Sequence, residues 1–171
     1  PETARNLDIG VEQRFLDGRA ALGMTWFRRT SRDLIAFSFA TFQSENIDRA
    51  RATGVEIELA LKPVDGVDLR ASWSRTDATN RSPGPLLGKR LALRPRDSVA
   101  LTADWQTPWR VRLGTTLTLT SDSFDDAANR VRLDGYALAA LRAALPLGGG
   151  LEAFGRVENL FDERYTVVAG Y

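Results

Sequence analysis

The stretch that decides the fold is Arg156-Val-Glu-Asn-Leu-Phe-Asp-Glu-Arg-Tyr-Thr-Val-Val-Ala-Gly-Tyr171. It predicts the end of a strand, Leu151 to Leu160, which runs into a loop that opens with Asn159, Asp162 and Tyr165. Asn and Asp favour turns because their side chains bond to nearby backbone groups. A strand end capped by a turn is therefore one interpretation of this stretch, and the sequence before it has to supply the rest of the sheet.

Tight turns and longer polar connections alternate along the chain. Gly, Pro and Asp reverse a chain at low conformational cost, and they mark four compact turns: Leu16-Asp17-Gly18, Pro63-Val64-Asp65-Gly66, Thr107-Pro108-Trp109 and Pro146-Leu147-Gly148-Gly149. The longer polar stretches are Thr41 to Asn46, Ala78 to Lys89 and Ser121 to Arg130. Outer-membrane β-barrels have this sidedness, with short turns at one end and long loops at the other.

The segments between these connections alternate apolar and polar residues, which is the signal of a β-strand. About eight strands are predicted, all antiparallel if joined in sequence. They are Asn6 to Phe15, Arg19 to about Phe39, Ile47 to Lys62, Val67 to Asp77, Ser98 to Gln106, Trp109 to Thr120, Arg130 to Leu145 and Leu151 to Leu160. Several are long, roughly 13 to 20 residues against a usual length of about 5–6. Crossing a bilayer takes only about 9–11 tilted residues.

In each predicted strand, every second residue is mostly apolar, and these positions share one face of the sheet, which we call the apolar parity. This parity also carries aromatic and basic residues. Trp105 and Trp109 flank a tight turn, where one aromatic belt of a membrane barrel is expected. Arg49, Arg51 and Arg75 share the apolar parity but lie far from the tight turns. This places them near the external interface, where a cationic side chain costs about 0–1 kcal/mol rather than about 2–4 kcal/mol at the midplane.

Composition excludes several function classes. The chain has no cysteine and no histidine, so thiolate metal sites and Ser-His-Asp or Cys-His catalysis are absent, and no enzyme activity or cofactor is expected. The sequence contains no run of about 18 apolar residues, so no membrane helix is predicted. The 23 basic and 22 acidic side chains nearly balance, which gives no electrostatic support for nucleic-acid binding.

Two other interpretations of the pattern remain open. The same alternation is compatible with a soluble β-sandwich or propeller, although a propeller blade holds four short strands where this chain holds one hairpin. The loop residues Asp122, Asp125 and Asp126 supply the carboxylate oxygens that calcium prefers. A solvated acidic loop is the alternative to a calcium site there.

The segment Asn159-Leu160-Phe161-Asp162-x-x-Tyr165, with Gly170-Tyr171 behind it, resembles the C-terminal signature of TonB-dependent outer-membrane receptors. The form with Val167 is most similar to the vitamin B12 (cobalamin) receptor branch. The stretch from Asn46 to Glu56 resembles a strand opening of the whole receptor family. Three further stretches fall in the order seen in cobalamin receptors: Pro85-Leu86-Leu87, Arg94-Pro95-Arg96 and Asp104-Trp105-Gln106.

This resemblance implies an all-β fold in which residues 1–171 form the C-terminal portion of a transmembrane antiparallel β-barrel of about 22 strands. The N-terminal plug, the TonB box and the final strand would lie outside this sequence. The implied function is TonB-dependent active uptake of cobalamin across the bacterial outer membrane, with TonB and outer-membrane lipid as partners. A ferric siderophore or haem receptor is the alternative, and a soluble β-sheet binding module is the second alternative.

Loop placement gives the candidate ligand-binding residues. In the external loops they are Thr79, Asn80, Arg81, Asp125, Asp126, Asn129 and Arg130. Along the barrel interior, Arg70, Ser74 and Thr118 are expected to line the path. The signature residues are expected to serve the architecture of the barrel, and they are Asn159, Leu160, Phe161, Asp162, Tyr165, Gly170 and Tyr171.

Overall fold

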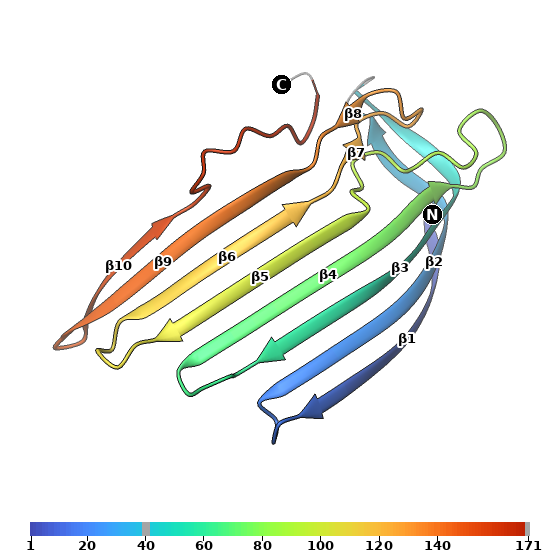
Figure 1. The fold of residues 1–171 in the computed structure, drawn as a ribbon. Helices are drawn as coiled ribbons and strands as arrows, with labels where there is room; N and C mark the ends of the chain where they lie inside the picture. The colour runs from blue at the N-terminus through green and yellow to red at the C-terminus, as the bar shows by residue number, and fades with distance from the viewer. Residues whose placement is uncertain (39–41, 170–171) are drawn as a thin grey trace.

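A computed structural model describes residues 1–38 and 42–169 of the chain. A single antiparallel sheet of eight strands dominates these residues, and its strands lie side by side in chain order (Figure 1). The strands are β1 (Thr3–Phe15), β2 (Ala20–Ser38), β3 (Gln43–Leu61), β4 (Val67–Asn80), β5 (Asp97–Gln106), β6 (Arg112–Thr120), β9 (Tyr136–Gly148) and β10 (Leu151–Val157), with β7 (Ser123–Phe124) and β8 (Arg132–Leu133) forming a small separate pair. The prediction of an all-β antiparallel fold with about eight strands is confirmed.

The tight turns all lie at one end of the sheet, which we call the tight-turn end, and the long connections lie at the other, the long-loop end (Figure 1). Residues 107–111 form one of these turns, closed by the backbone N–H of Thr107, which donates to the carbonyl of Val111 at 2.9 Å. The prediction that Trp109 begins a strand is therefore wrong. Trp109 lies in the turn, and β6 begins at Arg112.

Several other predicted boundaries differ from the structure. The strand predicted from Arg130 begins only at Tyr136, because the carboxylate of Asp126 accepts hydrogen bonds from the backbone N–H groups of Arg130 and Val131 and holds them in a loop. The last strand ends at Val157 rather than Leu160. The predicted loop from Thr41 to Asn46 is shorter than expected because β3 begins at Gln43; Thr41 itself lies outside the described residues.

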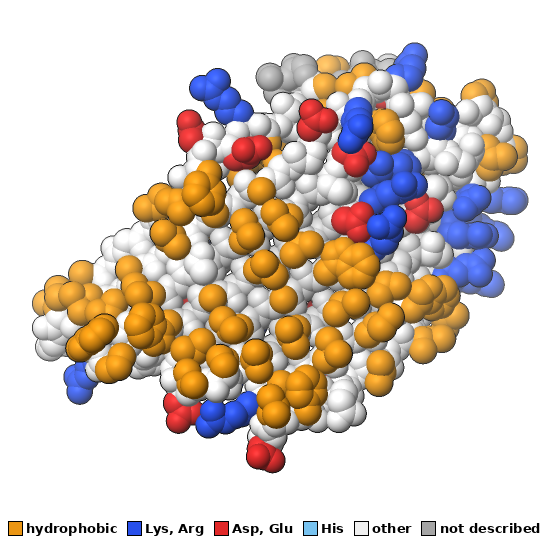
Figure 2. All heavy atoms as spheres, in the orientation of Figure 1, with side chains coloured by type: hydrophobic (Ala, Val, Ile, Leu, Met, Phe, Trp, Pro, Cys, Tyr) orange, Lys and Arg blue, Asp and Glu red, His pale blue; other side chains and the backbone are white. Residues whose placement is uncertain are grey.

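The pairing register separates the side chains into two faces. Directly paired residues of an antiparallel ladder lie on the same face. One face carries rows such as Trp26–Val55 and Ile57–Trp73–Val99–Leu119, and the other carries rows such as Glu56–Ser74–Ser98–Thr120. The sheet is curved, with β1 and β10 bending away from the viewer in Figure 1, and Figure 2 shows the apolar side chains spread over the convex face. The convex face is thus apolar, and the concave face is largely polar.

The described residues contain no sealed apolar core. The buried apolar side chains are small or lie in loops (Ala20, Ala50, Ala78 and Leu133), and no large side chain is fully buried. Many large apolar residues of the convex face are exposed, among them Trp105, Leu113 and Leu119. A soluble protein rarely leaves so continuous an apolar face uncovered. Within the described residues, no helix is long and apolar enough to cross a membrane.

Gly54 shows how closely neighbouring strands approach on the concave face. It pairs with Phe27 of β2 and Thr76 of β4. A Cβ atom built at Gly54 meets the Phe27 ring and the backbone carbonyl oxygen of Arg75 at distances that real Cβ atoms do not reach. The Phe27 ring therefore occupies the space that any side chain at position 54 would need. This gives a physical reason for glycine at this point in β3.

We expect Gly54→Ala to destabilise the sheet by about 1–3 kcal/mol, the usual cost of forcing extra atoms into a packed site. Gly23→Ala is the matched control, because a Cβ there has only the Glu58 Cβ within 4 Å, at 3.9 Å. Urea unfolding of the folded protein measures both variants. Equal unfolding midpoints for the two variants would show that Phe27 does not pack against Gly54 as described.

Candidate functional site

Three connections lie together at the long-loop end: residues 81–96, 121–135 and 158–169 (Figure 1). Backbone hydrogen bonds join the first to the sheet and to the second. The N–H of Leu91 donates to the carbonyl of Ala78 at 2.9 Å, and the N–H of Leu93 donates to the carbonyl of Phe124 at 2.7 Å. These connections are therefore packed structures rather than free loops.

Arg90 is the side chain that holds the first two connections together. Its guanidinium donates to the carboxylate of Asp122 at 3.1 Å and to the backbone carbonyl of Asp122 at 2.9 Å. It also lies over the ring of Phe124, 5.1 Å from the ring centroid. Only 12% of the Arg90 side chain is exposed. A largely covered charge is tolerated best when it is paired and hydrogen-bonded, as this one is.

Asn129 joins the same two connections through the backbone of Arg90. Its Oδ1 accepts from the Arg90 N–H at 2.8 Å, and its Nδ2 donates to the Arg90 carbonyl at 2.9 Å. The amide thereby makes the two bonds that a neighbouring strand would make. Asn129 has φ 59, in the left-handed region that Asn tolerates better than most residues.

Asp126 fixes the turn that follows. Its carboxylate accepts from the backbone N–H groups of Arg130 and Val131 at 2.7 and 2.8 Å and from Nε of Arg130 at 3.2 Å. Burial disfavours the charged form and by itself raises the pKa of Asp126, but these three bonds outweigh it and leave the pKa below its ordinary value. The ionised carboxylate therefore stabilises this loop.

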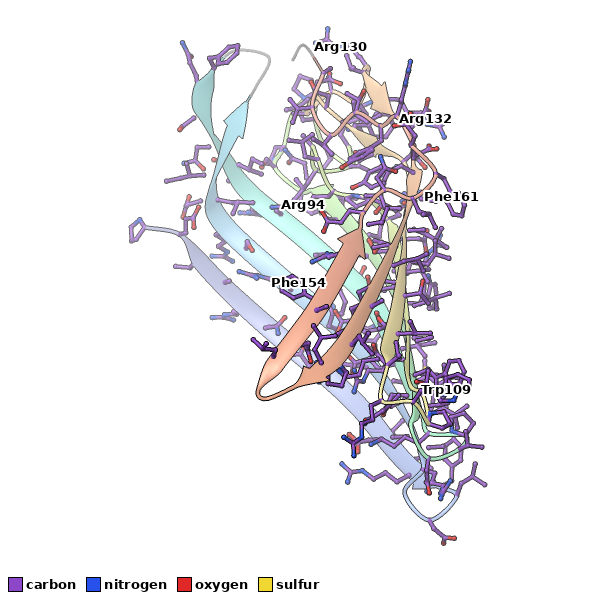
Figure 3. All side chains as sticks on the ribbon, turned by 90° about the vertical axis from the view of Figure 1, so that its left-hand side faces the viewer. Arg94, Trp109, Arg130, Arg132, Phe154 and Phe161 are labelled. Atoms are coloured by element: carbon purple, nitrogen blue, oxygen red, sulfur yellow. The ribbon has the colours of Figure 1, made fainter. Side chains whose placement is uncertain are left out.

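A pocket of about 310 Å³ opens between the tips of β2 and β3 and these connections. Its polar lining includes Asn80, Arg90, Arg94 and Asp125. The connection 81–96 carries five basic side chains and no acidic one. In Figure 3, Arg94 lies on the concave side of the loops, whereas Arg130 and Arg132 lie at their far end. The pocket thus combines apolar residues with two arginines and one aspartate, and of the two arginines Arg94 has no ion pair among the described side chains.

The structure brings only some of the sequence-predicted ligand residues to this pocket. Asn80 and Asp125 line it. Thr79 is buried within β4, while Arg81 is exposed beside the pocket and its backbone N–H donates to the carbonyl of Arg49. Asp126 and Asn129 hold the loop, and Arg130 is exposed at its far end.

Sequence reasoning missed Arg90 and Arg94 as pocket residues. The signal that identifies them is the run from 81 to 96, in which every charged side chain is basic.

The three aspartates proposed as a calcium site, Asp122, Asp125 and Asp126, each bind a different partner within the protein. Asp122 pairs with Arg90 and with Arg132, whose Nε lies 3.6 Å away. Asp125 accepts a bond from the backbone N–H of Ala169 at 3.0 Å. In the part of the chain that the structure describes, no group of three or more acidic side chains is arranged to hold a metal ion.

The C-terminal signature residues dock residues 158–169 against β9. Asn159 makes two bonds to the backbone of Glu163, accepting from its N–H at 2.9 Å and donating to its carbonyl at 3.0 Å. The N–H of Leu160 donates to the carbonyl of Ala139, and the Tyr165 ring stacks on Tyr136 at 4.4 Å. The side chain of Phe161 points to the convex side (Figure 3). Asp162 has φ 52, and Gly170 and Tyr171 lie outside the described residues.

The concave face below the loops is lined by polar side chains. Arg70, Ser74 and Thr118 all lie on this face, as their pairing partners show. Nearer the tight-turn end, two ion pairs reach across an intervening strand. Arg142 of β9 pairs with Asp104 of β5 across β6, and Arg112 of β6 pairs with Glu152 of β10 across β9. The concave face therefore carries charged side chains along its length, and its net charge is close to zero where these ion pairs form.

We expect Asp126→Asn to loosen the loop 121–135, because the loss of charge weakens hydrogen bonds worth about 1.5–3 kcal/mol. Amide hydrogen exchange of Val131 should become at least about tenfold faster at pH 7. In the unsubstituted protein the stabilisation is present above the ordinary pKa of aspartate, about 4, and is lost as the pH falls through the lowered pKa of Asp126.

The matched control is Asp134→Asn, because Asp134 is exposed in the same connection. It should leave exchange at Val131 unchanged. Equal exchange in both variants, or the same acid response in Asp126→Asn as in the unsubstituted protein, would contradict the role given to Asp126.

Comparison with known proteins identifies the family. The model of the family "TonB dependent receptor-like, beta-barrel" matches residues 1–160. The sequence is 25% identical over 175 residues to the ferric-pyoverdine 358 receptor of Pseudomonas putida, an alignment that covers 96% of this chain and 21% of that receptor. The chain therefore spans about a fifth of the length of this relative.

Solved structures show the same fold. The ferric yersiniabactin uptake receptor FyuA from Yersinia pestis superposes with a TM-score of 0.83 at 19% identity, covering 98% of this chain and 26% of that one. The siderophore receptor PiuA from Acinetobacter baumannii gives 0.80 at 18% identity, covering 96% and 25%. Together with the family match, this establishes that the chain belongs to the TonB-dependent receptor β-barrel family, whose members are transport receptors of the bacterial outer membrane and not enzymes.

Proposed function

We propose that this chain forms part of a receptor that takes up ferric siderophores across the outer membrane by TonB-dependent transport. The sequence alone favoured cobalamin as the ligand and kept iron chelates as the alternative. The relatives named above are receptors for ferric-pyoverdine, ferric yersiniabactin and a siderophore. Their names support the iron-chelate alternative better than the cobalamin interpretation.

The guanidinium of Arg94 in the pocket is the single observation that carries this proposal. Arg94 lines the pocket and makes no ion pair among the described side chains, and the whole connection 81–96 is basic. Hydroxamate, catecholate and carboxylate groups bind Fe(III) through negatively charged oxygens, and a guanidinium recognises such oxygens with strong charge-assisted hydrogen bonds. An anionic iron chelate therefore fits this wall of the pocket.

The remaining candidate residues take two roles in the proposed mechanism. Asn80 and Asp125 line the pocket. The amide of Asn80 can donate and accept hydrogen bonds, and the carboxylate of Asp125 accepts them. Arg81 and Arg130 extend the contact with the ligand at the exposed loops. Thr79, Asp126 and Asn129 support the loops that present these groups. After capture, the ligand passes along the polar concave face, past Arg70, Ser74 and Thr118.

Transport itself depends on parts of a receptor that these residues do not supply. The sheet has two edges, β1 and β10, each with one pairing partner in this chain. In hydrocarbon, unpaired backbone groups are costly and a spanning sheet has to close. We infer that further strands pair with both edges, that a plug fills the lumen and that TonB acts through it. The work of the protein is binding and gating, without covalent chemistry.

We expect Arg94→Gln to weaken the binding of a ferric siderophore by about tenfold, since it removes one charge-assisted hydrogen bond worth about 1.5–3 kcal/mol. Arg96→Gln is the matched control in the same connection, because Arg96 pairs with Asp77 at 3.0 Å and does not line the pocket. The measurement is quenching of receptor fluorescence by a panel that includes ferric pyoverdine and ferric yersiniabactin.

A competition arm decides between the two ligand classes. Binding of a ferric chelate that excess cyanocobalamin does not displace supports the proposal. Tight binding of cyanocobalamin with no response to any ferric chelate would overturn it in favour of the cobalamin interpretation. Equal loss of affinity in Arg94→Gln and Arg96→Gln would show that the pocket described above is not the site of capture.

A further inference from the structure

Five arginines from three neighbouring strands gather on the convex face near the long-loop end. The register places Arg32 of β2 directly opposite Arg49 of β3. Two residues further along the same strands, Thr30 of β2 lies opposite Arg51 of β3. Arg28 and Arg32 are therefore both diagonal neighbours of Arg51. Arg5 of β1 also lies opposite Thr30, on its other side. We call Arg5, Arg28, Arg32, Arg49 and Arg51 the arginine cluster.

The cluster lacks acidic partners among the described side chains. None of its five guanidinium groups forms an ion pair there, and Nε of Arg51 is buried without a hydrogen-bond partner. The neighbouring β4 differs, because Arg75 pairs with Asp97 at 3.4 Å and Asp77 pairs with Arg96 at 3.0 Å. Like charges directly opposite in a ladder destabilise a sheet. The arrangement of Arg32 and Arg49 is therefore unfavourable unless an anion lies between them.

The depth of the cluster indicates where that anion comes from. Arg28 follows Trp26 by two residues on the same face, and Trp26 pairs with Ile9 and Val55 of the apolar band. Figure 2 shows basic side chains gathered at the edge of this band, beside the upper parts of β2 and β3. The cluster thus borders the hydrocarbon-facing surface at the end where outer-membrane barrels carry their external loops. Lipid headgroups occupy this level of a membrane.

We propose that the arginine cluster binds the phosphorylated headgroup of a glycolipid in the outer leaflet of the membrane. Guanidinium groups match phosphate oxygens through paired N–H donors, and several of them near a membrane surface add their attraction to anionic lipid. A bound phosphate neutralises the facing charges of Arg32 and Arg49. This inference depends on the family's place in the outer membrane and not on the identity of the transported ligand.

The test compares two double variants of the complete receptor in neutral detergent. Arg32→Gln with Arg49→Gln removes two charges from the cluster. Arg14→Gln with Arg29→Gln removes the same charge from the concave face, where these residues pair with Ala21 and Ala52. Bound lipid is counted by native mass spectrometry during titration with bis-phosphorylated lipid A and, separately, with its dephosphorylated form.

We expect the cluster variant to bind the phosphorylated lipid about 25-fold more weakly, about fivefold for each arginine near an anionic surface, and the concave-face variant to bind it normally. Thermal unfolding provides the second measurement. Without lipid, the cluster variant should be as stable as the unsubstituted receptor or more so, because repulsion is relieved. Added phosphorylated lipid should then raise the unfolding temperature of the unsubstituted receptor more than that of the cluster variant.

Four results would overturn the proposal. The first is equal binding of lipid by the two double variants, and the second is equal binding of the phosphorylated and dephosphorylated lipids. The third is displacement of the lipid by inorganic phosphate with no requirement for acyl chains. The fourth is a change in the receptor's oligomeric mass in the cluster variant while lipid binding persists. The third result would indicate a soluble anion site, and the last a contact between neighbouring barrels.

Discussion

Backbone pairing between neighbouring strands is the constraint on which the rest of the structure depends. Each ladder, from β1–β2 to β9–β10, satisfies the backbone groups of long strands and at the same time fixes which side chains share a face. A shift of one residue in any pairing exchanges the two faces. Such a shift in β3 would turn Glu56 and Glu58 toward lipid and Ile57 and Leu59 toward the interior. The hydrophobic pattern and the ladders therefore specify the same register.

The long-loop end follows a different principle, because there the chain is ordered by side chains rather than by ladders. Arg90, Asn129 and Asp126 each bond to backbone groups of a connection distant in sequence or of the next turn. These bonds fix the two connections that surround the pocket residues Asn80 and Arg94. Preorganisation of this kind lowers the conformational entropy that a ligand has to offset on binding. The basic side chains that we propose for ligand capture and the hydrogen bonds that hold them thus come from the same two connections.

The sequence was sufficient for the fold, because period-two alternation and turn residues act locally. It predicted the eight strands, their two faces and the arginines on the apolar parity. It placed the start of β9 too early, since Arg130 is held by Asp126, and it assigned Trp109 to a strand that begins only after the turn. The pocket was harder to predict. Arg90 lies 32 residues from Asp122 and 39 from Asn129, and contacts of that range leave no periodic trace in a sequence.

We infer that the convex face meets hydrocarbon while the concave face meets a polar interior. The chain has no cysteine, so single cysteines from Ser98 to Trp105 along β5 can each carry a nitroxide in the receptor reconstituted in lipid. Collision with oxygen, which concentrates in hydrocarbon, should peak at Val99, Leu101, Ala103 and Trp105. Collision with a water-soluble nickel complex should peak at Ser98, Ala100, Thr102 and Asp104. A profile without this alternation, or one with the two sets exchanged, would contradict the account.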